Sequence, residues 1–333
     1  MTATKPQQHN KGPTREDSAG SRRQQAIDDS RDGGGRSRRE QAIEIAAMGT
    51  VYLNGEFVAA EAASISPMDR GFIFGDGIYE VVPVFGGRLF RPGQHLQRLR
   101  NSLGAIGLEN PLTDSQWASV LQRLVDDAGT DDQYVYLQVT RGVAPRNHAF
   151  PDNARPTVFA YAQRMNYATA TSAATGIAVI TAEDIRWRRC DIKSTALLAA
   201  VMLRQQAAES GADEAILVRD GLVTEGAASN VFLVRDDTVV TPPKGPLILA
   251  GITRDLVLEL AQQHDMPLIE RAVKENELAT AHEIWIASST NEIKPVIRID
   301  GATVGSGGPG PVFARMYQHY QDYKRAFCEG RVD

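Results

Sequence analysis

Short β-type runs alternate with amphipathic helical patterns along the sequence, and this alternation is what most constrains the fold. Residues 78–85 (IYEVVPVF) and 134–140 (YVYLQVT) are rich in β-branched and aromatic side chains, and Asn54-Gly55 between two such runs is typical of a hairpin turn. Residues 94–106 and 114–128 show the apolar spacing of helices. Strands and helices mixed in this way predict an α+β fold with helices packed on mixed sheets.

The second half of the sequence repeats this mixture after a small polar stretch at residues 166–176 (NYATATSAATG). Strands are predicted at 177–182 and 283–287, with a meander between 214 and 241 and helices at 195–210 and 253–264. The polar stretch is the expected linker. We therefore expect a smaller N-terminal domain over residues 49–168 and a larger C-terminal domain over 169–333.

Residues 1–48 have a composition that does not suit a folded core. They contain no Phe, Tyr or Trp and are rich in Gln, Ser, Gly, Arg and Asp. Such a segment cannot bury enough apolar surface to offset the entropy lost on ordering. It also lacks the continuous apolar stretch of a secretory signal. We expect a disordered N-terminal extension, with Met48 a candidate for the natural start of the folded protein.

Overall composition excludes several classes of function. The formal net charge of −5 argues against a nucleic-acid-binding protein. The two cysteines suggest neither a disulfide framework nor a cysteine-based zinc site, which favours a reducing cytoplasm. The six histidines are scattered without metal-binding spacing, so no metal site is predicted. No stretch reaches the roughly 18 apolar residues of a membrane span.

Lys193 stands where a basic segment, 186–195 (RWRRCDIKST), runs into an apolar helical pattern. Arg186, Arg188 and Arg189 lie just upstream, and neighbouring positive charges favour the neutral form of an amine. We expect a helix to begin at Thr195, where the positive end of its dipole would also disfavour a cation. A neutral lysine amine is the nucleophile that Schiff-base chemistry requires. A solvated surface lysine is the alternative interpretation.

Two later segments contain groups that could complement a reactive lysine. Glu225 follows a β-type run, and a carboxylate there could face a cationic ring nitrogen and keep it protonated, as a pyridoxal ring requires. A hairpin-end carboxylate is the alternative. Gly251-Ile252-Thr253 opens a predicted helix, whose free N–H groups form a ready phosphate site. Ser288 and Ser289, at the end of a strand, could add hydroxyl donors.

Two segments of the first half hold further candidates for anion binding. Arg98 lies on the helix predicted over 94–106, and its forked guanidinium could bind the same phosphate. Arg146 and His148 lie in a loop that contains Gly and Pro, residues 140–151 (TRGVAPRNHAFP), where an arginine suits a substrate carboxylate. Solvated surface arginines are the alternative for both positions.

Together these segments resemble pyridoxal-phosphate-dependent aminotransferases of class IV, fold type IV, and most closely the D-amino-acid aminotransferases. The resemblance is strong because seven segments occur in the family order between about residues 49 and 300. They are 69–82 (DRGFIFGDGIYEVV), 95–99 (HLQRL), 140–151, 184–194 (DIRWRRCDIKS), 223–232 (VTEGAASNVF), 251–255 (GITRD) and 288–296 (SSTNEIKPV).

The resemblance implies a role for each candidate residue. Lys193 would form the Schiff base with pyridoxal 5'-phosphate and carry the proton in a ping-pong transamination, and Glu225 would pair with the pyridine nitrogen. The phosphate would be bound by Arg98, Ile252, Thr253 and Ser289, with Ser288 nearby, and Leu249 would pack against the ring. The substrate carboxylate would be bound by Tyr79, Arg146 and His148, with Tyr136 close to it.

In this family the residues matching Tyr136, Arg146 and His148 come from the partner subunit. The resemblance therefore implies a homodimer, with each active site between the two domains and at the dimer interface. One departure concerns the cofactor site: Ala227 and Ala228 stand where well-known members have serines, which would loosen polar contacts near the cofactor.

The expected substrates are D-amino acids such as D-alanine or D-glutamate, paired with 2-oxoglutarate or pyruvate. Three enzymes of the same fold are the alternatives: a branched-chain L-amino-acid aminotransferase, an aminodeoxychorismate lyase and an (R)-amine transaminase. A binding protein that has lost the chemistry is a further alternative, disfavoured because the lysine, the glutamate and the phosphate-site residues are all present.

Overall fold

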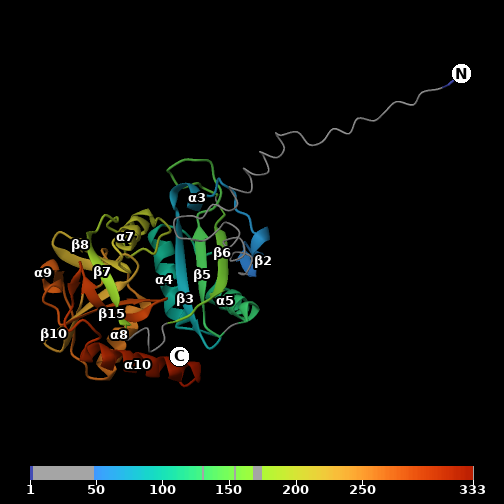
Figure 1. The fold of residues 1–333 in the computed structure, drawn as a ribbon. Coiled ribbons are helices and arrows are strands. Elements are labelled where there is room, and N and C mark those ends of the chain that lie inside the picture. The colour runs from blue at the N-terminus through green and yellow to red at the C-terminus, as the bar shows by residue number, and fades with distance from the viewer. Residues whose placement is uncertain (3–48, 130, 154, 168–174, 333) are drawn as a thin grey trace. The chain divides into compact units, whose positions relative to one another are not determined.

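The computed structural model describes residues 1–2, 49–129, 131–153, 155–167 and 175–332 (Figure 1). The predicted disordered extension lies outside the described residues, as does most of the predicted linker. Contacts divide the chain into two units, Met1–Gly49 and Thr50–Asp333, and every element described below belongs to the second.

A six-stranded antiparallel sheet is built from the first part of this unit, in the order β2-β1-β6-β5-β3-β4. Its strands are β1 (Thr50–Leu53), β2 (Glu56–Ala59), β3 (Gly77–Phe85), β4 (Arg88–Leu89), β5 (Gln133–Thr140) and β6 (Thr157–Arg164). Asn54 and Gly55 turn β1 into β2 with positive φ angles of 51° and 101°, as the Asn-Gly pair predicts. The register of β3 on β5 pairs Val81 with Tyr136 and Tyr79 with Gln138.

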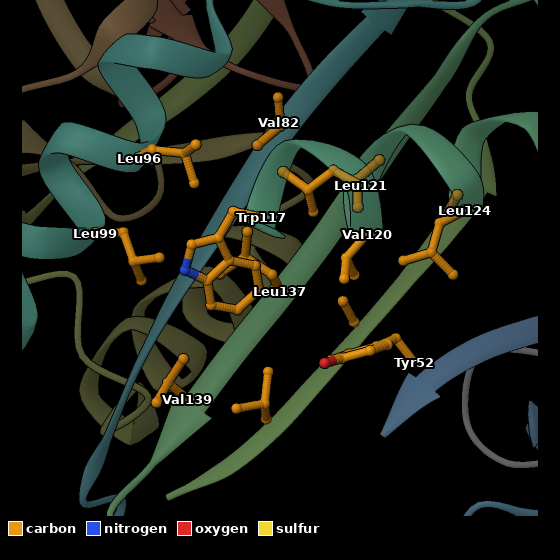
Figure 2. Packing of buried hydrophobic residues seen from close by; sticks show 14 of the residues in the cluster. Tyr52, Val82, Leu96, Leu99, Trp117, Val120, Leu121, Leu124, Leu137 and Val139 are labelled. Carbon is orange, nitrogen blue, oxygen red and sulfur yellow. The ribbon is translucent and has the colours of Figure 1, made fainter. Parts of the chain in front are cut away.

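Two helices cover one face of this sheet, α4 (Pro92–Ala105) and α5 (Asp114–Ala128). A capping box between Thr113 and Gln116 begins α5, and Gly129 ends it in the left-handed conformation. Figure 2 shows the core between helices and strands, where Trp117, Leu99 and Leu137 are fully buried. This core fixes α4 against β3, and both elements contribute side chains to the site described below.

A ten-stranded mixed sheet is built from the rest of the unit, in the order β12-β11-β10-β14-β15-β7-β8-β9-β13, with β16 beside β15. Its strands are β7 (Ile177–Glu183), β8 (Glu214–Arg219), β9 (Leu222–Gly226), β10 (Asn230–Arg235), β11 (Thr238–Thr241), β12 (Leu268–Glu270), β13 (Val273–Lys274), β14 (Glu283–Ser288), β15 (Glu292–Ile299) and β16 (Ala302–Thr303). The pairs β7–β8, β7–β15 and β11–β12 are parallel. The predicted α+β class is confirmed.

The remaining helices are η1 (Ala60–Ala62), α3 (Arg70–Phe74), α7 (Leu198–Glu209), α8 (Ile252–Gln263), α9 (Glu275–Leu278) and α10 (Pro311–Cys328). Helices α8 and α10 pack on one face of the ten-stranded sheet, and α10 is red in Figure 1. Phe85 and Phe90 from the first part of the unit belong to the same core, where Phe90 contacts Phe327 of α10 edge to face. The division into domains at residues 168 and 169 stays a prediction.

One predicted boundary next to the candidate lysine is wrong. The helix expected to begin at Thr195 begins at Leu198 instead. The reason is that the Thr195 backbone is bound elsewhere: its N–H donates to the Gly77 carbonyl at 2.9 Å, and its hydroxyl donates to the Gly75 carbonyl at 3.0 Å. The chain around Lys193 therefore lies along the first residues of β3 and does not enter a helix directly.

None of the helices in the described residues is both long enough and apolar enough to cross a membrane.

Candidate active site

Most of the predicted site residues line one cavity of about 430 Å³. Both sheets contribute to it: side chains from β3 and α4 face others from β9, the start of α8 and the end of β14. The predicted residues that line it are Tyr79, Arg98, Lys193, Glu225, Leu249, Ile252, Thr253, Ser288 and Ser289. Tyr136, Arg146 and His148 are not among the lining residues.

Lys193 is anchored to the first half of the fold through its backbone. Its carbonyl accepts a hydrogen bond from the Tyr79 N–H at 3.0 Å, and its own N–H donates to the Ser102 hydroxyl on α4 at 3.2 Å. The side-chain Nζ lies 4.1 Å from the centroid of the Tyr79 ring. These contacts hold the amine at the cavity wall beside an aromatic face.

The arginines upstream of Lys193 are all paired with carboxylates. Arg188 lies 3.9 Å from Asp220, and Arg189 lies 3.0 Å from Asp191. Arg186 binds Asp184 at 2.9 Å and Glu225 at 2.6 Å. Their charges are therefore compensated locally. Lys193 also precedes the first residue of α7 by more than a helical turn, so it does not lie at the N-terminus of a helix as predicted from the sequence.

Glu225 is a buried carboxyl group with three hydrogen-bond donors. Arg186 Nη1 donates to Oε1 at 2.6 Å, while Oε2 accepts from Asn230 Nδ2 and from the Leu249 N–H, both at 3.0 Å. Only 4% of Glu225 is exposed. Burial raises the pKa of Glu225 to about 7, against the opposing effect of Arg186 and the Leu249 N–H. A carboxyl group so held can face a cationic ring nitrogen in the cavity.

The start of α8 offers backbone donors to the cavity. Its N-cap is Gly251, and no side chain caps the helix. A β-carbon at Gly251 would lie 2.0 Å from Asn230 Oδ1, so only glycine fits there. Ile252 and Thr253 follow at the first helical positions and line the cavity. An uncapped helix start with free N–H groups is a suitable phosphate site.

Arg98 joins this helix start to the first sheet. Its Nη1 donates to the Ala250 carbonyl at 2.8 Å, and Nε and Nη2 bind the two oxygens of Glu80 at 2.7 and 2.8 Å. Burial alone would raise the pKa of Glu80, but the Arg98 guanidinium and His95 hold it well below its usual range. The Arg98 fork is therefore fixed at the cavity wall by an ionised partner.

Glu80 and His95 were not among the predicted site residues. His95 Nδ1 lies 2.8 Å from Glu80, and burial lowers the pKa of His95 despite this contact. Its other ring nitrogen, Nε2, is buried without a hydrogen-bond partner in the described part of the chain. The spacing of His95 and Arg98, three residues apart on one helix, was a signal that both face the same neighbour.

Arg146 and His148 lie on an exposed loop beyond the cavity. The ring of Phe74 lies 5.5 Å from the Arg146 guanidinium carbon and 5.3 Å from the His148 ring. Tyr136 stacks on Tyr79 with ring centroids 5.7 Å apart, so it is next to a cavity residue of its own chain. The structure thus brings the candidate lysine and the candidate phosphate-binding residues to one cavity, but not the loop predicted to bind the substrate carboxylate.

The family model described as "Amino-transferase class IV" matches residues 77–299, which run from the start of β3 to the end of β15. The chain belongs to the class IV aminotransferase family. Enzymes of this family use pyridoxal phosphate.

Named relatives and solved structures agree with this assignment. The chain is 44% identical over 262 residues to a D-alanine aminotransferase of Bacillus licheniformis, covering 79% of this chain and 92% of that protein. It resembles a branched-chain aminotransferase of the archaeon Thermoproteus uzoniensis, solved with norvaline, with a TM-score of 0.75 and 26% identity over 86% of this chain and 96% of that one. A fold IV-transaminase of Curtobacterium pusillum matches with a TM-score of 0.71 and 25% identity, over 83% and 93% of the two chains. Fold type IV is therefore confirmed.

The cavity of this class IV aminotransferase suits pyridoxal phosphate on chemical grounds. One end holds the Arg98 guanidinium and an uncapped helix start for a phosphate. The other groups are a buried carboxyl suited to a ring nitrogen and a lysine amine suited to an aldehyde. Among the described residues, no group of His, Cys, Asp and Glu could hold a metal ion.

Proposed function

We propose that this chain transfers the amino group of a D-amino acid, such as D-alanine or D-glutamate, to a 2-oxo acid such as 2-oxoglutarate or pyruvate. One observation carries the proposal: Lys193, Glu225, Arg98 and the start of α8 all face the same cavity. The name of the Bacillus licheniformis relative, at 44% identity, supports the D-amino-acid substrate. Pyridoxal phosphate, when bound, supplies the electron sink that allows a bond at the amino acid's α-carbon to break.

Different residues would bind the phosphate, the ring nitrogen and the ring face of the cofactor. The N–H groups of Ile252 and Thr253, the Arg98 guanidinium and the hydroxyls of Ser288 and Ser289 would bind the phosphate. Glu225 would hold a proton at the ring nitrogen, and Leu249 would pack against the ring. The Leu249 N–H also donates to Glu225, so one residue sets both the packing surface and the carboxylate position.

Lys193 would form the covalent link to the cofactor and move the α-proton of the substrate. The amine carries out the transfer only in its neutral form. The Tyr79 ring beside Nζ gives it an apolar face, and the backbone bonds to Tyr79 and Ser102 keep the residue from drifting away from the cavity wall. General acid–base transfer of this kind contributes roughly 10²–10⁴-fold to a rate.

The substrate carboxylate would be bound by Tyr79 together with Arg146 and His148 from the partner subunit, with Tyr136 nearby. Two observations support a homodimer. Arg146 and His148 are exposed and lie outside their own chain's cavity. On α7, Leu198, Val201 and Met202 present an apolar surface, with exposed fractions of 74%, 59% and 56%. Clustered exposed apolar side chains mark a contact surface.

The free cysteines Cys190 and Cys328 support a reducing cytoplasm as the location.

Apolar packing accounts for one of the two alanines that stand where well-known family members have serines. Ala227 is buried and packs with Leu203 and Ala207. We propose that Ala227 contributes to fixing α7 and also lines the cavity.

A panel of substrates tests the proposed function. Purified enzyme with pyridoxal phosphate is given D-alanine, L-leucine, L-valine or (R)-1-phenylethylamine with 2-oxoglutarate as acceptor, or D-glutamate with pyruvate. Aminodeoxychorismate is given alone. The proposal predicts keto acid from the D-amino acids. Turnover of L-leucine and L-valine without any D-amino acid would support the branched-chain alternative. Turnover of the amine alone would support the amine transaminase, and pyruvate from aminodeoxychorismate would support the lyase.

A further inference from the structure

Arg186 lines the cavity, yet none of the roles above uses it. It belongs to the basic segment upstream of Lys193, but its guanidinium binds Glu225 and Asp184. Its side chain is only 12% exposed. Burying a guanidinium, which is always charged, is unfavourable unless it is paired, and the contacts of Arg186 show which carboxylates pair with it.

The guanidinium of Arg186 is held in a fixed orientation by Asp184. Nε donates to Asp184 Oδ1 at 2.9 Å and Nη2 donates to Oδ2 at 3.0 Å, a two-bond fork-to-fork pair. Asp184 is itself fixed, because it accepts from the Thr224 hydroxyl at 2.9 Å and pairs with Arg219 at 3.0 Å. The remaining nitrogen, Nη1, is thereby directed at Glu225 Oε1, 2.6 Å away.

The other oxygen of Glu225 is fixed from two different segments. Oε2 accepts from Asn230 Nδ2 on β10 and from the Leu249 N–H in the segment before α8. Of the groups that bind Glu225, Arg186 alone carries a charge, and the nearby Asp184 carboxylate opposes it. Burial favours the protonated acid, so the ionised form depends on the cation more than on the neutral donors.

We propose that Arg186 is a positioning residue that favours the ionised form of the Glu225 carboxyl and directs it into the cavity, with Asp184 holding the arginine in place. This inference rests on the proposed function, because it concerns the carboxylate that would face the cofactor's ring nitrogen. It gives Arg186 the role of favouring the ionised form of Glu225. From the sequence alone, Arg186 was expected to favour the neutral form of Lys193 instead.

The consequence is that Glu225 and the ring nitrogen depend on a residue that touches neither the substrate nor the reacting carbon. Without the Arg186 charge, Glu225 would be protonated across the neutral range and could no longer stabilise a protonated ring nitrogen. An opposite charge within about 4–6 Å lowers a carboxyl pKa by roughly 1–3 units, so its removal should be large enough to measure.

The test is a titration of Glu225 in the full chain, before and after addition of pyridoxal phosphate. Glutamate labelled with ¹³C at the side-chain carboxyl gives a signal for Glu225, assigned by its absence in Glu225→Gln. In the cofactor-free wild type we expect a midpoint near pH 7. In Arg186→Gln it should rise by at least about one pH unit, and in Arg186→Lys by less, since lysine keeps the charge but loses the fork.

The matched control is Arg189→Gln, which removes the same charge three residues away at a half-exposed side chain bound to Asp191. Its midpoint should equal that of wild type. A wild-type midpoint in Arg186→Gln would overturn the inference, as would an equal rise in Arg189→Gln. If Arg186→Gln does not fold, Arg186→Met decides, because it also removes the charge while keeping a long side chain: a raised midpoint supports the inference and an unchanged midpoint contradicts it.

Cofactor binding separates this inference from the proposed function. We expect the Kd of Arg186→Gln for pyridoxal phosphate, measured by equilibrium dialysis at pH 6, to be about tenfold that of wild type and of Arg189→Gln, because below both midpoints a one-unit rise in pKa leaves about a tenth as much ionised Glu225. If the wild type binds no pyridoxal phosphate, the proposed function fails whatever the titration shows. If the wild type binds it and transaminates D-alanine while Arg186→Gln titrates and binds as wild type, only the inference fails.

Discussion

Tyr79 and Lys193 are joined twice, once through the backbone and once through their side chains. The Tyr79 N–H donates to the Lys193 carbonyl at 3.0 Å, and the lysine Nζ lies 4.1 Å from the tyrosine ring centroid. Ile78 and Ser194 extend this pairing as an isolated β-bridge. The segment that contains the candidate lysine is therefore paired with the first residues of β3. Changes in either partner should move the amine relative to the cavity.

Replacing Arg98 by glutamine should weaken the binding of pyridoxal phosphate. The substitution removes the charged fork from the cavity wall, and hydrogen bonds to charged groups contribute about 1.5–3 kcal/mol each. We expect the Kd of the cofactor to rise by about 10- to 100-fold in equilibrium dialysis. Arg100→Gln is the control, because Arg100 lies on the same helix and pairs with Asp114 near the surface. Equal Kd values for the two variants would remove Arg98 from the phosphate site.

The pair formed by Glu80 and Arg98 should make stability depend on pH in acid. The pKa of Glu80 in the folded chain lies below its ordinary value of 4.5, so the pair's full contribution is present above about pH 4.5 and is lost as the pH falls further. Glu80→Gln leaves a buried guanidinium without its counter-ion. It should lower the free energy of unfolding by about 3–5 kcal/mol at pH 7.

Denaturant unfolding of wild type and Glu80→Gln at pH 7, 5, 4 and 3 measures this difference. The gap between the two proteins should be widest at pH 7 and should narrow below pH 4.5, because Glu80 then takes up a proton in the unfolded wild type while it stays ionised in the folded chain. Glu109→Gln, at an exposed position, should follow the wild type throughout. A gap that stays constant from pH 7 to pH 3 would mean that Glu80 does not act through its charge.

Arg70 should affect substrate binding more than cofactor binding. Its guanidinium binds Asp76 at 2.8 Å and donates to the Asn147 carbonyl at 2.5 Å and the His148 carbonyl at 3.4 Å, which shapes the loop that holds Arg146. Lysine cannot make these contacts together. We expect Arg70→Lys to raise the KM for D-alanine about tenfold, the equivalent of one lost charged hydrogen bond.

The cofactor Kd and kcat serve as the internal controls for Arg70→Lys and should stay close to wild type. Arg123→Gln, on the exposed side of α5, should leave all three constants unchanged. A loss of cofactor binding parallel to the rise in KM would show a general loss of structure and would contradict a role confined to the loop.

A charge on the exposed face of α7 should separate the proposed dimer. Val201→Lys places an ammonium among Leu198 and Met202, and burying an unpaired charge at an interface is strongly unfavourable. Light scattering at micromolar concentration should give the mass of one chain for this variant and of two for wild type. Gln122→Lys on α5 is the control. A wild type that is monomeric while fully active would contradict the shared active site.

Much of this fold could be predicted from local patterns, because the formation of a helix or a turn depends largely on residues that are close in the sequence. The helix at 114–128 was predicted to the residue, since Thr113 and Gly129 are local cap signals. The start of α7 was not, because the hydrogen bonds that hold Thr195 come from Gly75 and Gly77, more than a hundred residues away. No element was predicted over residues 311–328, although Val312, Phe313, Met316 and Tyr320 of α10 recur at helical spacing.

The same holds for the site: residues in short motifs could be predicted, but contacts between residues far apart in the sequence could not. Lys193, Glu225 and the helix start at Gly251 were found from short motifs, and the structure places all three at one cavity. The partner of Arg186 was not found, because nothing local shows that it lies 2.6 Å from a glutamate 39 residues later. Glu80 was missed for the same reason: its alternating position in β3 looks like that of any strand residue until α4 packs on it.

Exchange of the substrate's α-proton tests the central claim most directly, since it needs only the lysine, the cofactor and one amino acid. Wild-type enzyme with pyridoxal phosphate is incubated in D₂O with D-alanine or L-alanine, without any 2-oxo acid, and the α-proton signal is followed by NMR. We expect the signal of D-alanine to disappear and that of L-alanine to remain. Lys193→Ala should exchange neither, while Lys274→Ala should behave as wild type. Exchange of L-alanine alone, or undiminished exchange of D-alanine in Lys193→Ala, would contradict the central claim.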